Sequence, residues 1–351
     1  MNFRRQDPPC KAQMMSASQS SVIVIGAGLT GLVAARTLAE HDQPSVVFDE
    51  ARSVGGRMAT RRLPGIGGAV ALVDHGAQFF TARSQEFQTE VDSWLSLGIA
   101  REWCRGFGET QDGYPRYCAP GGMNAITKHL ASGALVAVNA AVRSVGVIDE
   151  GLVVATDDDA RHLCTAAVLT PPVPQSLVLC DQGGLALHEN DRTELEMVRY
   201  ARCLALLVTV DRPGLIRSPG GLQLTTDQDR TFSFVADNQA KHLSPVPALT
   251  FHANDLISER HYDDLDDSLL SLLMSEAQRY LNGIGVVAAE IKRWRYARPT
   301  VTYPHRCLSI HPSHRTQIVF AGDAFGEAKV EGAFLSGLAA AQSVIEHIAA
   351  S

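Results

Sequence analysis

Three glycines near the start of the chain have the spacing of a phosphate-binding turn. Gly26, Gly28 and Gly31 form the pattern G-x-G-x-x-G. In such a turn the first glycine allows a sharp bend, the second lets a pyrophosphate approach the backbone, and the third lets the next helix lie close to the strand. Leu29 and Thr30 would begin that helix, whose free N–H groups point at the phosphates. The pattern predicts a dinucleotide site.

The flanking residues predict the elements that position this site. Residues 22–25 are a continuous β-branched run, typical of a strand buried on both faces. The sequence favours a helix over 29–40 and a second strand over 45–48, which leads into Asp49 and Glu50. An acid about 20 residues beyond the glycines can accept hydrogen bonds from ribose hydroxyls. These elements have the order of a dinucleotide-binding fold, but that order does not distinguish NAD from FAD.

The next turn helps to distinguish between NAD and FAD as the cofactor. Gly55, Gly56 and Arg57 form a segment that resembles the G-G-R turn of the flavin amine oxidase superfamily, in which the turn and the arginine approach FAD. In that superfamily the ribose acid lies eight residues before the arginine, which selects Asp49 over Glu50. The resemblance implies FAD. Because no cysteine lies in a covalent flavin attachment motif, we expect the FAD to be bound non-covalently.

The other end of the chain resembles a second flavin fingerprint of the same superfamily. Residues 318–323 form a predicted strand that ends in Gly-Asp, and the resemblance implies that Asp323 bonds a ribityl hydroxyl of FAD. Glu331, Gly332 and Ala333 open the last predicted helix. The N–H groups of this helix start would face the flavin pyrimidine carbonyl and stabilise the charge that appears there on reduction.

Two further segments resemble the renalases, a branch of this superfamily. Residues 74–83 read DHGAQFFTAR, and residues 293–299 read RWRYARP. The first segment implies that Gln78 and Phe79 approach the FAD. The two segments extend the resemblance into the middle of the chain.

Three residues are candidates to contact a substrate. Trp294 could stack on a flat ring, and His252 stands in a segment that matches a renalase L-H-A sequence. Asn238 is a third polar candidate. For each residue a purely structural role in the core is the alternative. His75 and Arg83 could face the flavin, and for them a hydrogen-bonded structural role is the alternative.

The resemblance implies an activity. Renalases oxidise the 2- and 6-dihydro isomers of NAD(P)H to NAD(P)+, and oxygen then reoxidises the flavin and yields hydrogen peroxide. Two alternatives stay open: an amine oxidase or desaturase-type flavin oxidoreductase acting on another small molecule, and a flavin-bearing binding protein without turnover. Monoamine oxidases place a lysine and an aromatic cage near the flavin. Neither is recognisable here, because Lys241 stands in a polar stretch that indicates surface.

Composition excludes several classes of partner. The formal net charge of −7 argues against nucleic acid and against a basic membrane-binding face. The seven cysteines are scattered without C-x-x-C spacing, which indicates reduced thiols and no zinc site. No stretch reaches the roughly 20 apolar residues of a membrane span. We expect a cytoplasmic enzyme, and no pattern predicts its oligomeric state.

The expected fold is α/β, with a Rossmann-type FAD-binding domain of the two-lobed flavin amine oxidase or p-hydroxybenzoate hydroxylase type and a mixed-sheet substrate domain. With 351 residues, two lobes are expected. The polar residues 1–20 read as a disordered extension. The FAD-binding domain is predicted to be discontinuous, over 21–80, 119–172 and 300–351, and the substrate domain covers 81–118 and 173–299. Residues 135–138, 142–148 and 152–156 predict a three-stranded β-meander.

Overall fold

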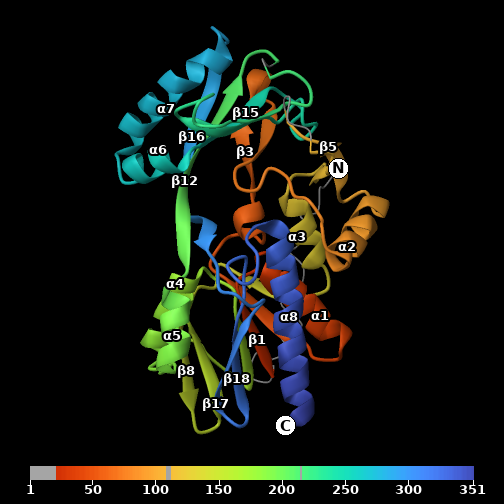
Figure 1. Ribbon diagram of the computed structural model, residues 1–351, viewed down its shortest axis with the longest axis vertical. Helices are drawn as coiled ribbons and strands as arrows, with labels where there is room; N and C mark the ends of the chain where they lie inside the picture. The colour runs from red at the N-terminus through yellow and green to blue at the C-terminus, as the bar shows by residue number, and fades with distance from the viewer. Residues whose placement is uncertain (1–20, 108–111, 214–215) are drawn as a thin grey trace, which may run out of the picture.

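The computed structural model describes residues 21–107, 112–213 and 216–351. The disordered extension expected over residues 1–20 lies outside these ranges. The described chain forms two lobes stacked along the long axis of the molecule, with β1, β18, α1 and α8 in one lobe and β15, β16, α6 and α7 in the other (Figure 1). This two-lobed α/β architecture is the predicted one.

A six-stranded sheet forms the centre of the first lobe. Its strand order is β17-β18-β11-β1-β2-β7, and all neighbours are parallel except β17 and β18. The strands are β1 (Val22–Ile25), β2 (Ser45–Asp49), β7 (Leu135–Val138), β11 (Ala166–Leu169), β17 (Leu308–Ser313) and β18 (Thr316–Phe320). Every residue of β1 and β11 is buried, as expected for a parallel sheet covered on both faces.

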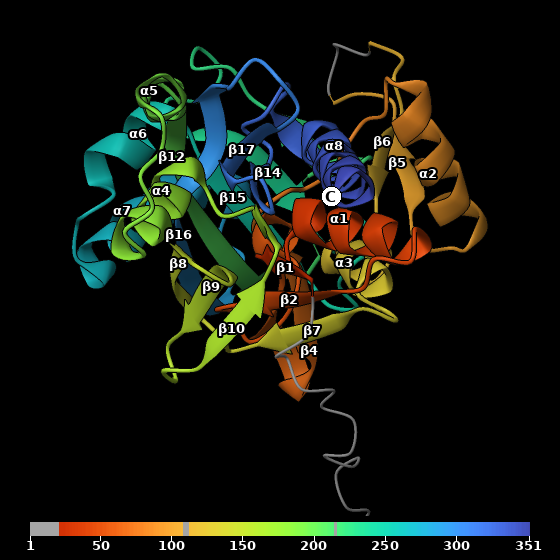
Figure 2. The same cartoon turned by 90° about the horizontal axis from the view of Figure 1, so that it is seen from below.

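Helices cover one face of this sheet. The helix α1 (Leu29–Glu40) has the predicted bounds and lies beside α8 (Lys329–Ala350), and α3 (Asn124–Leu130) lies near the start of α1 (Figure 2). By length and composition alone α8 could cross a membrane, contrary to the expectation that no stretch would. Its apolar residues from Ala333 to Val344 pack against α1 and the sheet, as in a core helix of a globular protein.

The other face of the sheet is covered by a β-meander, and the meander differs from the predicted one. It consists of β8 (Val142–Ile148), β9 (Gly151–Thr156) and β10 (Arg161–Cys164). The strand β7 instead joins the main sheet and runs parallel to β2. Because β7 follows the helix α3, its connection is a crossover, which places a strand parallel to its neighbour. Strand propensity alone does not reveal the partner of a strand.

Two segments expected in the substrate domain pack into the first lobe. The helices α4 (Val173–Gln182) and α5 (Glu189–Glu196) share a hydrophobic core with Ile23 and Ile25 of β1. The helix α2 (Gln85–Ser96) packs in the core formed by α1 and α8. The apolar faces of these helices are visible in the sequence, but the surface that buries each face is decided only in three dimensions.

A five-stranded antiparallel sheet forms the second lobe, in the order β13-β14-β15-β12-β16. Its strands are β12 (Arg199–Val210), β13 (Gly221–Gln223), β14 (Phe232–Asp237), β15 (Ala248–Ala253) and β16 (Val286–Val301). The helices α6 (Asp255–His261) and α7 (Asp266–Leu281) cover one face. The hairpin of β3 (Thr60–Pro64) and β4 (Val70–Asp74) packs on the other face. A small sheet of β5 (Arg101–Cys104) and β6 (Arg116–Cys118) completes the fold.

Candidate active site

The three glycines of the N-terminal turn have different reasons to be glycine. Gly26 has φ +100, a conformation that other residues rarely adopt. A Cβ at Gly31 would lie 2.0 Å from the Gly26 carbonyl oxygen, so this position needs a bare backbone to bring α1 onto β1. A Cβ at Gly28 would meet no atom within 4 Å. The absent side chain of Gly28 therefore leaves open space rather than a packing contact.

The open space at Gly28 fits the phosphates of a dinucleotide. It lies in front of Leu29, the first residue of α1, whose N–H groups are available to an anion. The Gly55–Gly56 turn approaches from the other side: the Gly55 N–H donates to the Ala27 carbonyl at 2.9 Å, and a Cβ at Gly56 would lie 3.5 Å from Gly28 Cα. The two turns thus form a backbone cradle.

The acid at the end of β2 lies at this cradle. Asp49 Oδ2 accepts a hydrogen bond from the Ala27 N–H at 2.6 Å, and Asp49 Oδ1 accepts from the Ala51 N–H at 2.7 Å. Glu50 is exposed. The Cβ of Asn124 lies 3.5 Å from the place of a Cβ at Gly55, and its buried Oδ1 accepts no hydrogen bond from the part of the chain that the structure describes. A hydroxyl-bearing ligand would satisfy that oxygen, although Asn124 was not among the predicted cofactor-binding residues.

The two predicted flavin fingerprints meet in an ion pair. Arg57 Nη1 lies 2.7 Å from Asp323 Oδ2 and also donates to the Tyr296 carbonyl at 3.2 Å. Burial raises the pKa of the Asp323 carboxyl, and the Arg57 guanidinium opposes that rise. The pair joins the second glycine turn to the loop after β18.

Residues at the start of α8 mainly hold the protein together. Thr30 Oγ1 donates to the Ala333 carbonyl at 2.9 Å, which ties α1 to α8. The Glu331 carboxylate accepts the N–H groups of Arg83 at 3.1 Å and of Ser84 at 2.6 Å. A Cβ at Gly332 would lie 1.6 Å from the Glu327 carbonyl oxygen. The side chains of Thr30 and Glu331 are thus committed to protein contacts, and only backbone groups there are available to a cofactor.

The side chains of Gln78 and Phe79 lie in different surroundings. Gln78 Nε2 donates to the Asp74 carbonyl at 2.7 Å, whereas its buried Oε1 accepts no hydrogen bond within the described part of the chain. Phe79 belongs to an aromatic cluster with Trp103, Phe107 and Phe234, whose ring centroids lie 5.0–6.4 Å apart. The sequence did not reveal this cluster, because its members come from three separate segments.

His75, Trp294 and His252 lie together where the lobes meet. The rings of His75 and Trp294 stack with centroids 5.2 Å apart and planes 14° apart, and Trp294 Nε1 donates to the His75 carbonyl at 2.8 Å. His75 Nδ1 and His252 Nε2 are buried and have no hydrogen-bond partner among the described residues. Burial, reinforced by nearby positive charge, lowers the pKa of His75 to about 3 and that of His252 to about 4. Both imidazoles are therefore neutral at neutral pH.

The charge beside these rings is positive. Lys292 Nζ lies 5.0 Å from the centre of the Trp294 ring. Lys292 and Arg61 both contribute to the low pKa of His75. Arg61 is paired with Glu290 at 2.7 Å, whereas no ion pair to Lys292 occurs among the described residues. The group thus offers flat rings, two neutral imidazoles and a cation.

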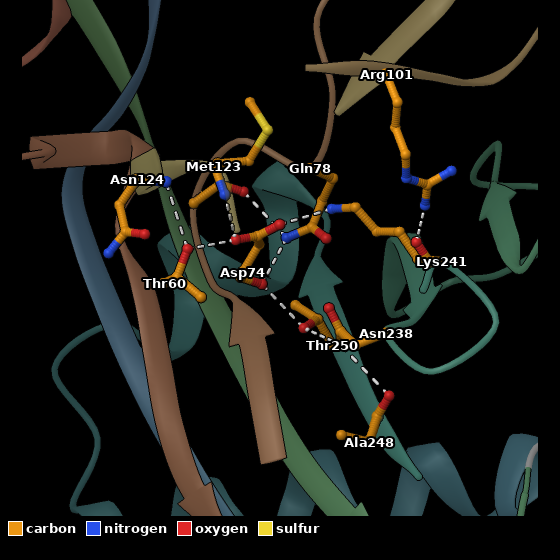
Figure 3. Close-up of polar contacts among 11 residues, drawn as sticks. Thr60, Asp74, Gln78, Arg101, Met123, Asn124, Asn238, Lys241, Ala248 and Thr250 are labelled. Carbon is orange, nitrogen blue, oxygen red and sulfur yellow. Dashed lines mark hydrogen bonds and ion pairs between the residues drawn. The ribbon is translucent and has the colours of Figure 1, made fainter. Parts of the chain in front are cut away.

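Two expectations about the β14–β15 region need correction. Asn238 is fully buried and donates from Nδ2 to Thr250 Oγ1 at 3.0 Å, so its side chain lies in the core rather than facing a substrate. Lys241 was expected at the surface but is 1% exposed, with Nζ 2.7 Å from Asp74 Oδ2 (Figure 3). The polar residues around Lys241 gave no sign of burial, because its carboxylate partner is 167 positions away. Within the described residues no group of three or more metal-ligating side chains occurs.

A two-lobed fold with a dinucleotide cradle in one lobe and buried rings at the junction defines a nucleotide-dependent oxidoreductase. Residues 24–92 match the NAD(P)-binding Rossmann-like domain, and residues 95–345 match the flavin containing amine oxidoreductase family. The chain belongs to the flavin-containing amine oxidoreductase family. It is an FAD-dependent oxidoreductase, and the cradle at Gly28 and Gly56, with Asp49, Arg57 and Asp323, suits the FAD of that family.

Solved structures share the fold at low sequence identity. A putative protoporphyrinogen oxidase from Exiguobacterium sp. 255-15 has a TM-score of 0.67 at 12% identity, over 93% of this chain and 98% of that one. A redesigned putrescine oxidase has a TM-score of 0.65 at 16% identity, over 95% and 99%. An L-amino acid dehydrogenase from Synechocystis sp. (strain ATCC 27184 / PCC 6803 / Kazusa) is 33% identical over 81 residues, which is 23% of this chain and 16% of that relative.

Proposed function

We propose that the protein is an oxidase of isomeric dihydronicotinamide dinucleotides, converting 2- and 6-dihydro-NAD(P) to NAD(P)+ while oxygen is reduced to hydrogen peroxide. The observation that carries the proposal is the stack of Trp294 on His75. Each residue belongs to one of the two segments that resemble renalases, and the fold brings these segments into contact. A dihydronicotinamide is itself a flat ring that suits such a surface.

The chemistry of this substrate matches the absence of a strong base near the rings. The lone pair of the substrate's ring nitrogen drives loss of the hydride, so the protein need not remove a proton. His75 and His252, with pKa values of about 3 and 4, are weak bases. FAD, when bound, accepts the hydride and passes two electrons to oxygen. The protein's own contribution is to hold the ring in place and exclude water.

The neutral imidazoles and the cation can each bind a different part of a dinucleotide. No residue in 21–107, 112–213 or 216–351 is hydrogen-bonded to His75 Nδ1 or His252 Nε2, so each can exchange a hydrogen bond with a carboxamide. Lys292 lies over Trp294, where its charge favours the anionic pyrophosphate of the substrate. The same charge disfavours a protonated amine.

The amine oxidase alternative gains support from the aromatic cluster and the buried Lys241, which the sequence did not reveal. However, Lys241 Nζ is held 2.7 Å from Asp74 Oδ2 and lies 5.1 Å from the centre of the Trp103 ring. This lysine is therefore committed to protein contacts. Proteins with the same fold act on different substrates, so the fold does not decide between the alternatives.

Anaerobic mixing of the purified holoprotein with candidate reductants tests the proposal. We expect 2- and 6-dihydro-NAD to bleach the flavin rapidly, NADH slowly, and benzylamine or putrescine not at all. NADH releases its hydride from ring carbon 4, and a misplacement of about 1 Å costs on the order of 100-fold in rate. An amine that bleaches the flavin faster than either isomer would contradict the proposal. A photoreduced flavin that air fails to reoxidise would favour a binding protein without turnover.

A further inference from the structure

A fully buried ion pair lies in the second lobe, between the β3–β4 hairpin and the β14–β15 turn, close to the start of α3 in the first lobe. Asp74 is the last residue of β4, and Lys241 lies in the turn between β14 and β15. Both side chains are 0% exposed, and Lys241 Nζ lies 2.7 Å from Asp74 Oδ2 (Figure 3). The turn is held by Asp237, whose Oδ1 accepts the N–H groups of Gln239 and Ala240.

Asp74 bonds to several elements at once. Its Oδ1 accepts from Thr60 Oγ1 at 2.6 Å and from the Met123 N–H at 2.9 Å, next to the start of α3. Its carbonyl accepts from Gln78 Nε2 at 2.7 Å and from Thr250 Oγ1 at 2.9 Å. Figure 3 shows these contacts converging on Asp74 from both lobes.

The residues that follow Asp74 connect it to the active site. His75 follows Asp74 directly, stacks on Trp294 and accepts its indole N–H. A Cβ at Gly76 would lie 2.0 Å from the Arg57 carbonyl oxygen, which also accepts the Ala77 N–H at 2.9 Å. Arg57 in turn pairs with Asp323. A displacement of Asp74 therefore moves both the His75 ring and the backbone of the flavin-binding turn.

Stability alone is a poor reason for such a pair. Removing two charges from water is costly, and replacing a buried ion pair by neutral side chains of similar volume is often neutral or stabilising. Breaking the pair by changing one partner leaves an uncompensated buried charge. Because this pair lies at the lobe junction, directly before His75, its role is better explained by the active-site residues that it holds in position.

We propose that Asp74 and Lys241 are positioning residues that set the place of His75 and Arg57 at the junction of the lobes. The proposal rests on the FAD chemistry of the family rather than on the dihydronicotinamide substrate. It assigns Lys241, which contacts neither Arg57 nor His75 directly, an effect on both through Asp74.

Three variants test this role: Asp74→Asn, Lys241→Met and the double variant. Each single change leaves one buried charge unpaired, so we expect a lower melting temperature of the apoprotein and less bound FAD. The double variant has no unpaired charge and keeps acceptors for Thr60 and the Met123 N–H. We expect it to regain stability and FAD content but to show a shifted flavin absorption spectrum and a flavin reduction by 6-dihydro-NAD slowed about 10- to 100-fold.

A matched control changes another pair with a buried carboxylate. Asp229 is 1% exposed, accepts two backbone N–H groups and lies 2.9 Å from Arg279, at the end of the second lobe covered by α7. The double change Asp229→Asn with Arg279→Met should leave the flavin spectrum and the reduction rate unchanged.

A stable Asp74→Asn/Lys241→Met protein with the wild-type spectrum and reduction rate would overturn the positioning role. If the double variant does not fold, Lys241→Gln is measured in the same way. A wild-type spectrum and a wild-type reduction rate in Lys241→Gln would also overturn the positioning role. Failure of the proposed function gives a different result. In that case the dihydro-NAD isomers do not bleach the wild-type flavin. The absorption spectra and the reduction potentials of the bound flavin can still be compared between the variants and the wild type.

Discussion

Arg57 Nη1 lies 2.7 Å from Asp323 Oδ2, although the two residues are 266 positions apart in the chain. The pair brings the second glycine turn of the N-terminal segment against the Gly-Asp end of β18. Asp323 is half-buried, and its removal from water raises the pKa of its carboxyl. Arg57 is thus the cation that keeps a carboxylate in place where the two halves of the FAD site meet.

Removing this cation should weaken FAD binding. Arg57→Met leaves Asp323 without its partner and frees the Tyr296 carbonyl, so we expect FAD affinity to fall about tenfold or more, at a cost of about 1–3 kcal/mol in stability. Titration of the apoprotein with FAD and thermal unfolding measure the two effects. Arg192→Met, which removes an exposed pair with Asp181, serves as the control and should change neither. Unchanged FAD affinity in Arg57→Met would show that the pair is not part of the site.

Gly28 and Gly31 should respond differently to a side chain. Gly28→Val places its side chain in open space, so the apoprotein should fold while FAD content falls sharply, because the side chain fills the phosphate cradle. Gly31→Ala should instead destabilise the apoprotein, since its Cβ would lie 2.0 Å from the Gly26 oxygen. Visible absorbance reports the FAD and circular dichroism the folding. A yellow Gly28→Val protein with full FAD content would contradict this placement.

Trp294 and His252 should control the rate of flavin reduction. Trp294→Ala removes the ring that stacks on His75, and His252→Ala removes a buried imidazole. We expect both to slow reduction by 6-dihydro-NAD about 10- to 100-fold, as for a misplaced substrate, with FAD content unchanged. His314→Ala, at an exposed position, is the control. Variants that lose stability yet reduce at the wild-type rate would assign both residues to the core alone.

The buried histidines predict a dependence of stability on pH. The pKa of His75 is about 3 in the folded protein, below its ordinary value, so the unfolded chain binds this proton first as pH falls. Stability should therefore decrease as pH falls from about 7 toward 4, with His75 alone contributing on the order of 2 kcal/mol between about pH 7 and pH 5. His252, with a pKa of about 4, acts in the same direction.

Thermal unfolding of the apoprotein at several pH values measures this effect. His75→Phe keeps a ring beside Trp294 but cannot titrate, so its melting temperature should fall less steeply with acid than that of the wild type. His314→Phe changes an exposed histidine and should retain the wild-type dependence. Parallel pH profiles for wild type and His75→Phe would show that His75 does not carry the dependence.

Local patterns identified the cofactor lobe because its signals lie within short stretches. These signals are the buried β-branched run of β1, the glycines, the helix over 29–40 and Asp49. Each interacts with residues that are close to it in the sequence, so its place in the sequence is enough to predict its place in the fold. The Gly-Asp after β18 was found by its resemblance to a flavin fingerprint, which also lies within a short stretch. The strands, the glycines and the helix predicted the fold class, whereas the resemblance of the G-G-R turn and of the Gly-Asp segment to a known superfamily implied FAD.

The same reasoning failed where a residue's role depends on a distant partner. Lys241 stands among polar residues, and only the approach of Asp74 makes its burial possible. Asn238 was expected to face a substrate, but Thr250 takes its amide hydrogen bond. Glu331 was expected to serve the cofactor, but the Arg83 and Ser84 N–H groups take its carboxylate.

The sequence by itself determined the nucleotide-binding elements, because hydrophobic periodicity, glycine conformation and helix polarity act over a few residues. The class of chemistry was implied by short segments that resemble a known superfamily. Only the tertiary structure decided which side chains meet at the junction of the lobes. Trp294 and His75 are 219 positions apart, and Lys241 and Asp74 are 167 apart. Their contacts depend on how the β3–β4 hairpin packs on the sheet of the second lobe, which no local pattern encodes.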